Sequence, residues 1–237
     1  ADEFIYHEML AHVPILAHGH ARRVLIIGGG DGGMIEEVLK HRTVEKVVMV
    51  EIDQRVLTLC QKYFTKLSLG AFDDPRLELI IGNGAEYVAS TCYNFDVIIV
   101  DSPDPIGPGT DLFSETFYFN CHRRLGSDGV LVTQSGAPFV QTEELRNSAS
   151  RLSQHFMDVA FYRASIPTYY GGDMAFGWAS DTRALRTVSV AQLQDRFARA
   201  NITTHYYNPE IHLAAFTMPP WINKILQTNN STTDPAR

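Results

Sequence analysis

The sequence predicts an α/β fold built on a doubly wound, mostly parallel seven-stranded sheet with an antiparallel edge strand. Three observations support this prediction. Short β-branched apolar runs alternate with helical patterns along most of the chain, the first run ends in glycines, and two late apolar runs are joined by a short turn-rich segment. Alternating strands and helices imply right-handed crossovers, and such crossovers make consecutive strands parallel.

The first five strands are predicted from apolar runs without polar alternation, the pattern of strands buried on both faces. They span residues 22–28, 46–52, 77–81, 95–100 and 129–134. Helices are predicted from apolar spacing and capping residues. They span residues 32–41, 54–67, 84–90, 114–125 and 142–156.

The last third of the chain predicts two more strands, at residues 158–164 and 175–180. The connection between them is short, which favours an antiparallel pair at the sheet edge. A Ser-x-x-Gln capping box that begins at Ser189 predicts a helix over residues 189–200.

We expect one Rossmann-like domain over residues 22–226. Residues 1–21 are too few to hold a core and are interpreted as a lead-in segment. The polar, Asn/Thr-rich tail over residues 227–237 is expected to be disordered.

Composition limits the function classes. The formal charge is −7 and no large Lys/Arg cluster is present, which argues against nucleic acid as a partner. The apolar runs are far shorter than the roughly 20 residues of a membrane span, and the first residues lack the pattern of a secretory signal. Cys60, Cys92 and Cys121 form an odd set without C-x-x-C spacing and are interpreted as reduced thiols. We expect a cytoplasmic protein.

A glycine loop, Gly-Gly-Gly-Asp-Gly-Gly at residues 28–33, follows the first strand and opens a helix. Glycines such as Gly28 and Gly30 permit a tight turn and a close backbone approach to a ligand. An acid at Asp31 would repel a pyrophosphate, so the loop favours a ligand with a cationic group, such as an amine next to a sulfonium. An ordinary glycine-rich turn is the alternative.

Two further strand ends carry polar residues. Glu51 ends the second strand, where a carboxylate can accept both ribose hydroxyls of an adenosine. A helix-capping role is the alternative for Glu51, but Asp53 fits that role better. Asn83 and Gly84 close the third strand, where a side chain can reach an adenine edge or simply form an Asn-Gly turn.

The fourth strand is followed by Asp101 and Asp104, three residues apart. Ligands of doubly wound sheets bind outside the carboxyl ends of the strands, and two acids in one crevice repel each other unless a cation joins them. A pair of loop caps is the alternative. Together with Asp31 and Glu51, these acids predict a carboxylate-rich rim that suits a polycationic substrate.

Five motifs in order resemble the spermidine synthases, a family of polyamine aminopropyltransferases, and are most similar to the bacterial type. The motifs are Tyr-His-Glu-Met at residues 6–9, the glycine loop, Val-Glu-Ile-Asp at 50–53, Asp-Ser-Pro-Asp-Pro at 101–105 and Pro-Thr-Tyr-Tyr-Gly-Gly at 167–172. The resemblance implies a methyltransferase-type sheet. It also implies transfer of an aminopropyl group from decarboxylated S-adenosylmethionine to putrescine, giving spermidine and methylthioadenosine.

The resemblance also assigns roles to residues. Asp101 would be the catalytic carboxylate, Glu51 would hold the ribose, Asn83 would contact the adenine, and Asp31 would bind the aminopropyl ammonium. The co-substrate side would also include Gly28, Gly30 and Gly84. The diamine channel would be lined by Tyr6, His7, Asp104, Gln134 and Tyr169. Decarboxylated S-adenosylmethionine would be a co-substrate, and no prosthetic group or metal is implied.

Members of this family normally carry an N-terminal β-rich domain before the motif Asp-Glu-Phe, so residues 1–21 are interpreted as the remnant of that region. A homodimer or homotetramer is expected in the full-length form. The family usually has Asp where this chain has Asn83.

Other functions remain as alternatives at this point. The glycine loop and Glu51 would serve an S-adenosylmethionine-dependent methyltransferase equally well, and a catalytically impaired polyamine or nucleoside binder would keep the same crevice. A nicotinamide dehydrogenase is disfavoured by Asp31. His12, His18 and His20 have no acid or cysteine ligand nearby in the sequence, and we interpret them as structural or solvent-facing.

Overall fold

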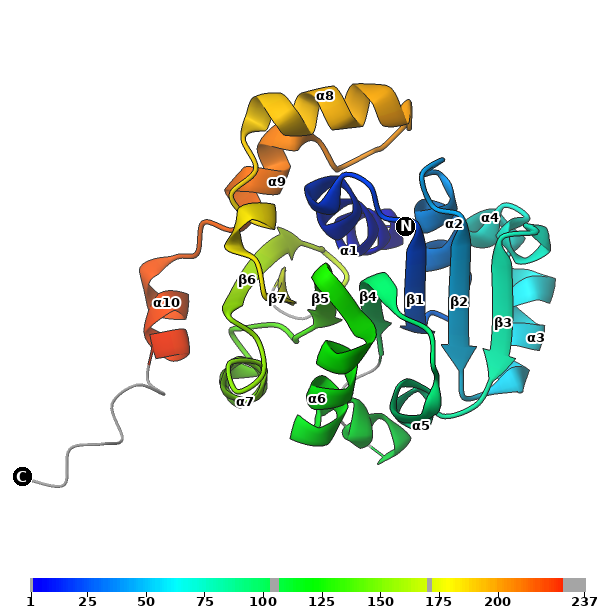
Figure 1. Cartoon of the computed structure of the whole chain (residues 1–237), viewed down its shortest axis with the longest axis horizontal. Helices are drawn as coiled ribbons and strands as arrows, with labels where there is room; N and C mark the ends of the chain where they lie inside the picture. Colours follow the sequence, from blue (N-terminus) through cyan, green and yellow to red (C-terminus); the bar gives the residue numbers. More distant parts are fainter. Residues whose placement is uncertain (1, 103–106, 170–171, 228–237) are drawn as a thin grey trace, which may run out of the picture.

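The computed structural model of the chain describes residues 2–102, 107–169 and 172–227. Its centre is a seven-stranded sheet in the order β3-β2-β1-β4-β5-β7-β6 (Figure 1). The strands are β1 (Arg23–Gly28), β2 (Lys46–Glu51), β3 (Leu77–Ile81), β4 (Phe95–Asp101), β5 (Leu125–Gln134), β6 (Asp158–Ser165) and β7 (Asp173–Ser180). Strands β1 to β5 are mutually parallel, as predicted.

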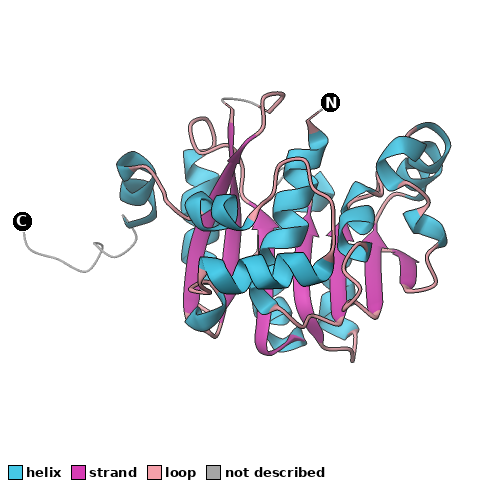
Figure 2. Cartoon of the chain, turned by 90° about the horizontal axis from the view of Figure 1, so that it is seen from above, coloured by secondary structure: helices cyan, strands magenta, loops and turns pink. Residues whose placement is uncertain are grey.

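Helices cover both faces of the sheet (Figure 2). One face packs against α1 (Glu3–His18), α2 (Gly33–Leu39), α8 (Val190–Ala200) and α9 (Pro209–Ala215), and the other packs against α5 (Gly84–Ser90), α6 (Glu115–Arg124), α7 (Thr142–Leu152) and α10 (Pro220–Gln227). The short helices α3 (Gln54–Tyr63) and α4 (Thr65–Ser68) lie beside β2 and β3. Each face has its own apolar cluster, the two-sided burial that the apolar strands predict.

The last two strands form the predicted antiparallel pair. Strand β7 is antiparallel to both β5 and β6 and lies between them, so that β6 is the edge strand at this end of the sheet. The helix predicted over residues 54–67 is instead divided at Phe64, whose φ and ψ of −113° and 32° leave the helical region. Strand β5 begins at Leu125 rather than at residue 129, and α7 ends at Leu152 rather than at residue 156.

Helix α1 occupies most of the segment that was expected to be a lead-in. Residues Ile5 to His18 of this helix are all buried, and the helix packs on α2 and β5 within the same core as the sheet. A helix buried on all sides lacks the polar face that gives a periodic signal, which is why the pattern did not predict it. The domain boundary at residue 22 remains a prediction.

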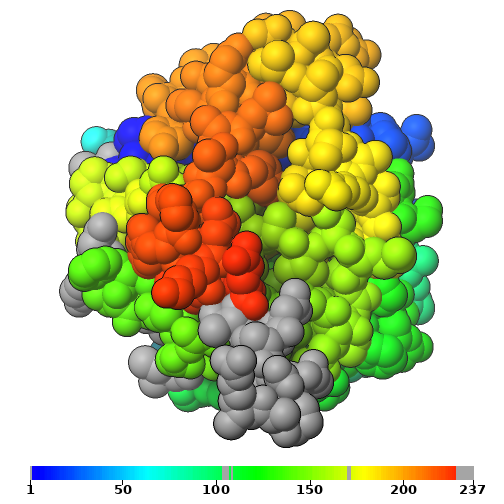
Figure 3. All heavy atoms as spheres, turned by 90° about the vertical axis from the view of Figure 1, so that its left-hand side faces the viewer, coloured from blue at the N-terminus to red at the C-terminus, as the bar shows by residue number. Residues whose placement is uncertain are grey.

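The C-terminal helices α9 and α10 were not predicted. Figure 3 shows α10, in red, on the surface beside the region of α7, which it contacts. Of the tail expected to be disordered, residues 228–237 lie outside the described residues. Among the helices that the structure describes, none combines the length and the apolar character that crossing a bilayer requires.

Candidate active site

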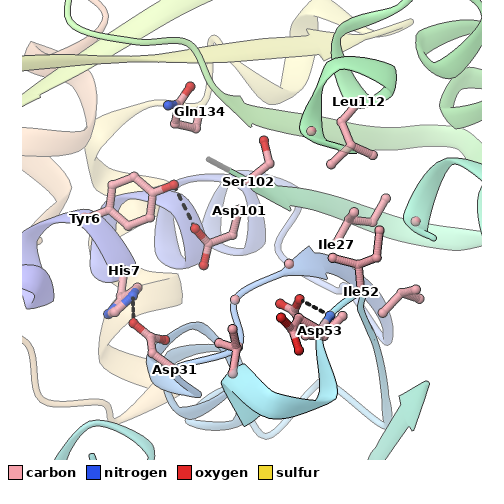
Figure 4. Close-up of a pocket in the computed structure, with 18 of the residues that line it drawn as sticks. Tyr6, His7, Ile27, Asp31, Ile52, Asp53, Asp101, Ser102, Leu112 and Gln134 are labelled. Carbon is pink, nitrogen blue, oxygen red and sulfur yellow. Dashed lines mark hydrogen bonds and ion pairs between the residues drawn. The ribbon is translucent and has the colours of Figure 1, made fainter. Parts of the chain in front are cut away.

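A cavity of about 770 Å³ opens at the carboxyl ends of the parallel strands (Figure 4). Most of the residues that the sequence assigns to a site line this one cavity. They are Tyr6, His7, Gly28, Gly30, Asp31, Glu51, Asn83, Gly84, Asp101, Gln134 and Tyr169. Asp104, the remaining predicted residue, lies outside the described residues. Three of the four predicted carboxylates therefore share one rim.

The glycine loop is shaped by contact between the ends of β1 and β4. Gly28 has a φ of +86°, and a Cβ at this position would lie 1.9 Å from the carbonyl oxygen of Asp101. The amide of Gly29 donates to the same oxygen at 3.2 Å. Only glycine satisfies both the positive φ and this close approach, so the loop turns directly beneath the side chain of Asp101.

Asp31 and His7 form a pair at one side of the cavity. Asp31 Oδ2 lies 3.4 Å from His7 Nε2, and its Oδ1 accepts the amide of Gly33 at 2.9 Å. Burial is the largest single effect and acts against the charged form of both groups. Their mutual hydrogen bond, the nearby charges and the Gly33 amide together outweigh it, so that the pKa of His7 is raised and that of Asp31 is lowered. A Cβ on Gly33 would meet the His7 ring at 2.4 Å, so this glycine makes room for the imidazole.

Asp101 ends the central strand β4 and accepts a hydrogen bond of 2.9 Å from the hydroxyl of Tyr6. Burial raises the pKa of Asp101 to about 6, an effect that the Asp31 charge adds to and that His7 and the Tyr6 hydrogen bond oppose. Burial and the Asp101 charge raise the pKa of Tyr6, which stays a donor. A carboxylate with a pKa near neutrality is suited to accept a proton at physiological pH.

Glu51 lies at the end of β2, and its side chain is buried. Its Oε1 accepts the amide of Asp53 at 2.9 Å, while Asp53 caps helix α3 by accepting the amide of Arg55. The capping role that was the alternative for Glu51 thus belongs to Asp53. A Cβ on Gly30 would lie 3.0 Å from Glu51 Oε2, so the glycine loop and the Glu51 carboxylate border the same space.

Asn83 is the N-cap of α5. Its Oδ1 accepts the amides of Ala85 at 2.8 Å and Glu86 at 3.4 Å, and the residue also lines the cavity. The side-chain oxygen is therefore engaged by the backbone, which leaves the amide NH₂ for a ligand. Gly84 allows close packing of this turn on β1, because a Cβ there would meet Ile27 Cγ2 at 2.3 Å.

Gln134 and Tyr169 complete the predicted channel residues, and Glu3 joins them. Tyr169 donates to Glu3 Oε2 at 3.1 Å, and its ring meets the Tyr6 ring edge to face at a centroid distance of 5.8 Å. Gln134 is buried and accepts the amide of Gly136. Sequence reasoning missed Glu3 because it did not predict α1; on a helix, residues three apart lie on one face, which would have placed Glu3 beside Tyr6.

Apolar side chains form the other end of the cavity. Figure 4 shows Ile27, Ile52 and Leu112 on the side of Asp53, away from Tyr6 and His7. These residues were not predicted as site residues, because apolar residues in or beside strands are read as core. The cavity thus has an acidic and aromatic end, which carries Asp101, and a more apolar end, which also holds the carboxylates of Glu51 and Asp53.

A family model described as the spermine/spermidine synthase domain matches residues 3–189. The chain belongs to the spermine/spermidine synthase family. This confirms the family that the five motifs predict.

Individual relatives of this family are similar over nearly the whole chain. Polyamine aminopropyltransferase 1 of Pseudomonas aeruginosa is 57% identical over 222 residues, which are 94% of this chain and 78% of the relative. A polyamine aminopropyltransferase of Klebsiella pneumoniae is 54% identical over 95% of this chain and 79% of its own length.

Solved spermidine synthases confirm the fold class. One, determined in complex with the transition state analogue AdoDATO, superposes with a TM-score of 0.89 at 41% identity, covering 95% of this chain and 76% of that one. The spermidine synthase of Thermotoga maritima gives a TM-score of 0.85 at 40% identity, with 95% and 74% covered.

Proposed function

We propose that the chain transfers an aminopropyl group from decarboxylated S-adenosylmethionine to putrescine, giving spermidine and methylthioadenosine. The observation that carries this proposal is the two-ended cavity, in which a more apolar end adjoins an acidic, aromatic end that carries Asp101. The names of the relatives, polyamine aminopropyltransferases, support the same reaction class. They also support the enzyme class expected from the sequence, an aminopropyltransferase.

The apolar end suits the nucleoside half of the co-substrate. Ile27, Ile52 and Leu112 offer flat apolar surface for an adenine, and Glu51 offers carboxylate oxygens for two ribose hydroxyls. Asn83, placed at the cap of α5, would donate its amide NH₂ to an adenine nitrogen. These contacts require no charge on the ligand, which matches a neutral nucleoside.

The acidic end suits the amines. Asp31 would bind the ammonium of the aminopropyl group, with His7 beside it. Tyr6, Gln134 and Tyr169 would line the diamine channel, and Glu3, held by Tyr169, adds a further carboxylate oxygen near the channel. Asp104 belongs to the channel by resemblance.

The reaction is an in-line displacement at the carbon next to the sulfonium. The amine nitrogen forms the new N–C bond, the C–S bond breaks with its electron pair going to sulfur, and the proton of the attacking nitrogen goes to Asp101. A carboxylate with a pKa of about 6 is ionised at neutral pH and can accept this proton. The Tyr6 hydroxyl fixes the orientation of the carboxylate through Oδ1.

Charge placement also favours this direction of transfer. The sulfonium loses its positive charge as the amine attacks, whereas the nitrogen gains positive charge. Carboxylates near the nitrogen, as at Asp101, therefore stabilise the transition state more than carboxylates near the sulfur would. The apolar surroundings at the nucleoside end favour the loss of the positive charge on the sulfonium.

The methyltransferase remains the rival function on this type of sheet. A methyl transfer needs no second cation site, but Asp31, Asp101 and Glu3 are gathered beyond the place expected for the sulfonium.

The cytoplasmic location and the homodimer or homotetramer expected from the sequence belong to the proposal as well. Light scattering tests the oligomeric state.

Product analysis tests the proposed function. The chain is incubated with decarboxylated S-adenosylmethionine and putrescine, and in parallel with S-adenosylmethionine and the same amine. We expect methylthioadenosine and spermidine in equal amounts from the first mixture and no S-adenosylhomocysteine from the second. Binding of methylthioadenosine measured by calorimetry, with no product in either mixture, would instead identify a catalytically impaired binder.

A further inference from the structure

A second cluster of polar side chains lies at the opposite edge of the sheet from the cavity. His18 is the last residue of α1, His20 follows in the link to β1, and Asp128 lies near the start of β5. One ligand atom from each of the three residues lies within 4.8 Å of the others. His18 and His20 have no acidic neighbour along the sequence, but the fold brings Asp128 to them from more than a hundred residues away.

The distances within this cluster resemble the edges of a coordination tetrahedron. His20 Nε2 lies 3.2 Å from Asp128 Oδ2, and His18 Nε2 lies 3.8 Å from the same oxygen. Zinc binds His nitrogen and carboxylate oxygen at about 2.0–2.2 Å in tetrahedral sites, so two ligand atoms of such a site lie roughly 3.3 Å apart. The three side chains thus need only small movements to share one ion.

His18 supplies an independent indication of a ligand. Its side chain is 1% exposed, and its Nε2 has no hydrogen-bond partner among the described residues, although it is directed at Asp128. A buried polar atom without a partner is costly. Because a bound cation would satisfy this nitrogen, we propose that His18, His20 and Asp128 form a site for a divalent transition-metal ion such as Zn²⁺.

The chain geometry before β1 holds the two rings together. Gly19 has a φ of +82°, and its amide donates to the carbonyl of Ile15, the left-handed turn that commonly ends a helix. This turn returns His20 to His18, so that the ring centroids are 4.3 Å apart. Two imidazoles and one carboxylate with an open fourth position are a donor set that zinc uses in proteins.

Two features oppose binding and limit its strength. The amide of His20 approaches His18 Nδ1 at 3.4 Å, which favours the proton on Nε2, whereas a metal at Nε2 requires the proton on Nδ1. The contact is long and therefore weak, and metal binding would break it. Arg196, whose Nη1 donates to the carbonyls of Leu16 and Ala17, adds a positive charge nearby. We therefore expect a site of moderate rather than structural affinity.

Zinc titration of the tag-free chain tests this site, because a polyhistidine tag would bind the ion itself. Calorimetry should give one Zn²⁺ per chain, and a hundredfold excess over Kd should raise Tm by at least about 5 °C. The long-range ¹H–¹⁵N spectrum of the imidazoles should show the His18 proton moving to Nδ1. The readouts do not depend on enzyme activity.

Variants at the two exposed ligands make the test specific. His20→Ala and Asp128→Asn should each weaken Zn²⁺ binding more than about tenfold, the scale of removing one supporting group. His122→Ala is the matched control, because His122 pairs with Asp181 at 2.7 Å and lacks a third ligand among the described residues. No binding by the parent chain, or equal binding by all three variants, would overturn the proposal.

Discussion

The hydroxyl of Tyr6 lies 2.9 Å from Oδ1 of Asp101 and donates a hydrogen bond to it. This bond connects helix α1 with the carboxyl end of β4, through two residues that are 95 positions apart in the chain. It also lowers the pKa of Asp101 by stabilising the charged carboxylate, against the larger effect of burial, which favours the neutral form.

Tyr6→Phe should raise the pKa of Asp101 and slow the reaction. A hydrogen bond to a charged group contributes about 1.5–3 kcal/mol, and about 1.4 kcal/mol corresponds to one pKa unit. The acidic limb of the kcat/KM profile, which reports the free enzyme and is expected at about pH 6 in the parent chain, should therefore move upward by about one pH unit. At pH values below this limb, kcat/KM should fall by up to about tenfold. The control is Tyr93→Phe, at an exposed residue. An unmoved limb would show that Asp101 does not titrate in catalysis.

Asp101→Asn tests the general base directly. The amide keeps the size of the side chain and can still accept from Tyr6, but it cannot take a proton from the attacking amine. We expect kcat to fall by at least about a hundredfold, the scale of losing a general base, whereas calorimetry should still detect binding of methylthioadenosine. Near-normal turnover would remove Asp101 from the catalytic role.

Glu51→Gln separates co-substrate binding from catalysis. The glutamine carbonyl can still accept the amide of Asp53, as Glu51 Oε1 does at 2.9 Å, so the turn should be preserved. The lost carboxylate would weaken the hold on the ribose hydroxyls, and KM for decarboxylated S-adenosylmethionine should rise about tenfold or more while KM for putrescine changes little. Glu45→Gln, at a surface residue, is the control. Equal changes in both KM values would contradict the assignment of Glu51 to the ribose.

Much of the fold could be predicted from the sequence because the parallel strands have a local signature. The runs that became β1, β2 and β4 are largely buried on both faces, whereas β3, at one edge of the sheet, is partly exposed. The glycines and acids that follow these strands mark the strand ends. Since parallel strands end at one edge, Asp31, Glu51 and Asp101 could be placed together without coordinates. The capping box at Ser189 likewise predicted α8 correctly.

Helix α1 could not be predicted in the same way, because the features that stabilise it are contacts with distant parts of the chain and not a local sequence pattern. It is buried on all sides, so it lacks amphipathic spacing, and its polar residues are satisfied by partners far along the chain. Glu3 was missed for this reason, although Tyr6 and His7 were recovered through the resemblance. The meeting of His18 with Asp128 depends equally on tertiary packing.

The His7–Asp31 pair should make stability depend on pH. Folding raises the pKa of His7, so the contribution of the protonated ring is fully present below its ordinary value of about 6.5 and is lost as pH rises through the folded value. His7→Gln should therefore lower the free energy of unfolding more at pH 5.5 than at pH 8. The two decreases should differ by at least about 1 kcal/mol, the scale of a charge-assisted hydrogen bond. Urea unfolding at the two pH values measures the difference. A cost independent of pH would mean that His7 stays neutral.

Glu8 offers a prediction about stability rather than catalysis. Its side chain is fully buried, and its two oxygens accept the amides of His205, Tyr206 and Tyr207 at 2.7–2.8 Å. It thereby fixes the chain after α8 against the helix that carries Tyr6 and His7.

Glu8→Gln should destabilise the chain strongly, although the two side chains have the same shape. Glutamine has one carbonyl oxygen, so its NH₂ must face at least one of the three amide donors, and a buried donor left unsatisfied costs about 1–3 kcal/mol. We expect the free energy of unfolding to fall by at least about 2 kcal/mol, measured by urea denaturation. Glu45→Gln, the same exchange at a side chain that is 66% exposed and pairs with Arg22 at 3.7 Å, should change it by less than about 1 kcal/mol. Equal effects of the two exchanges would show that the Glu8 contacts add nothing to the stability of the fold.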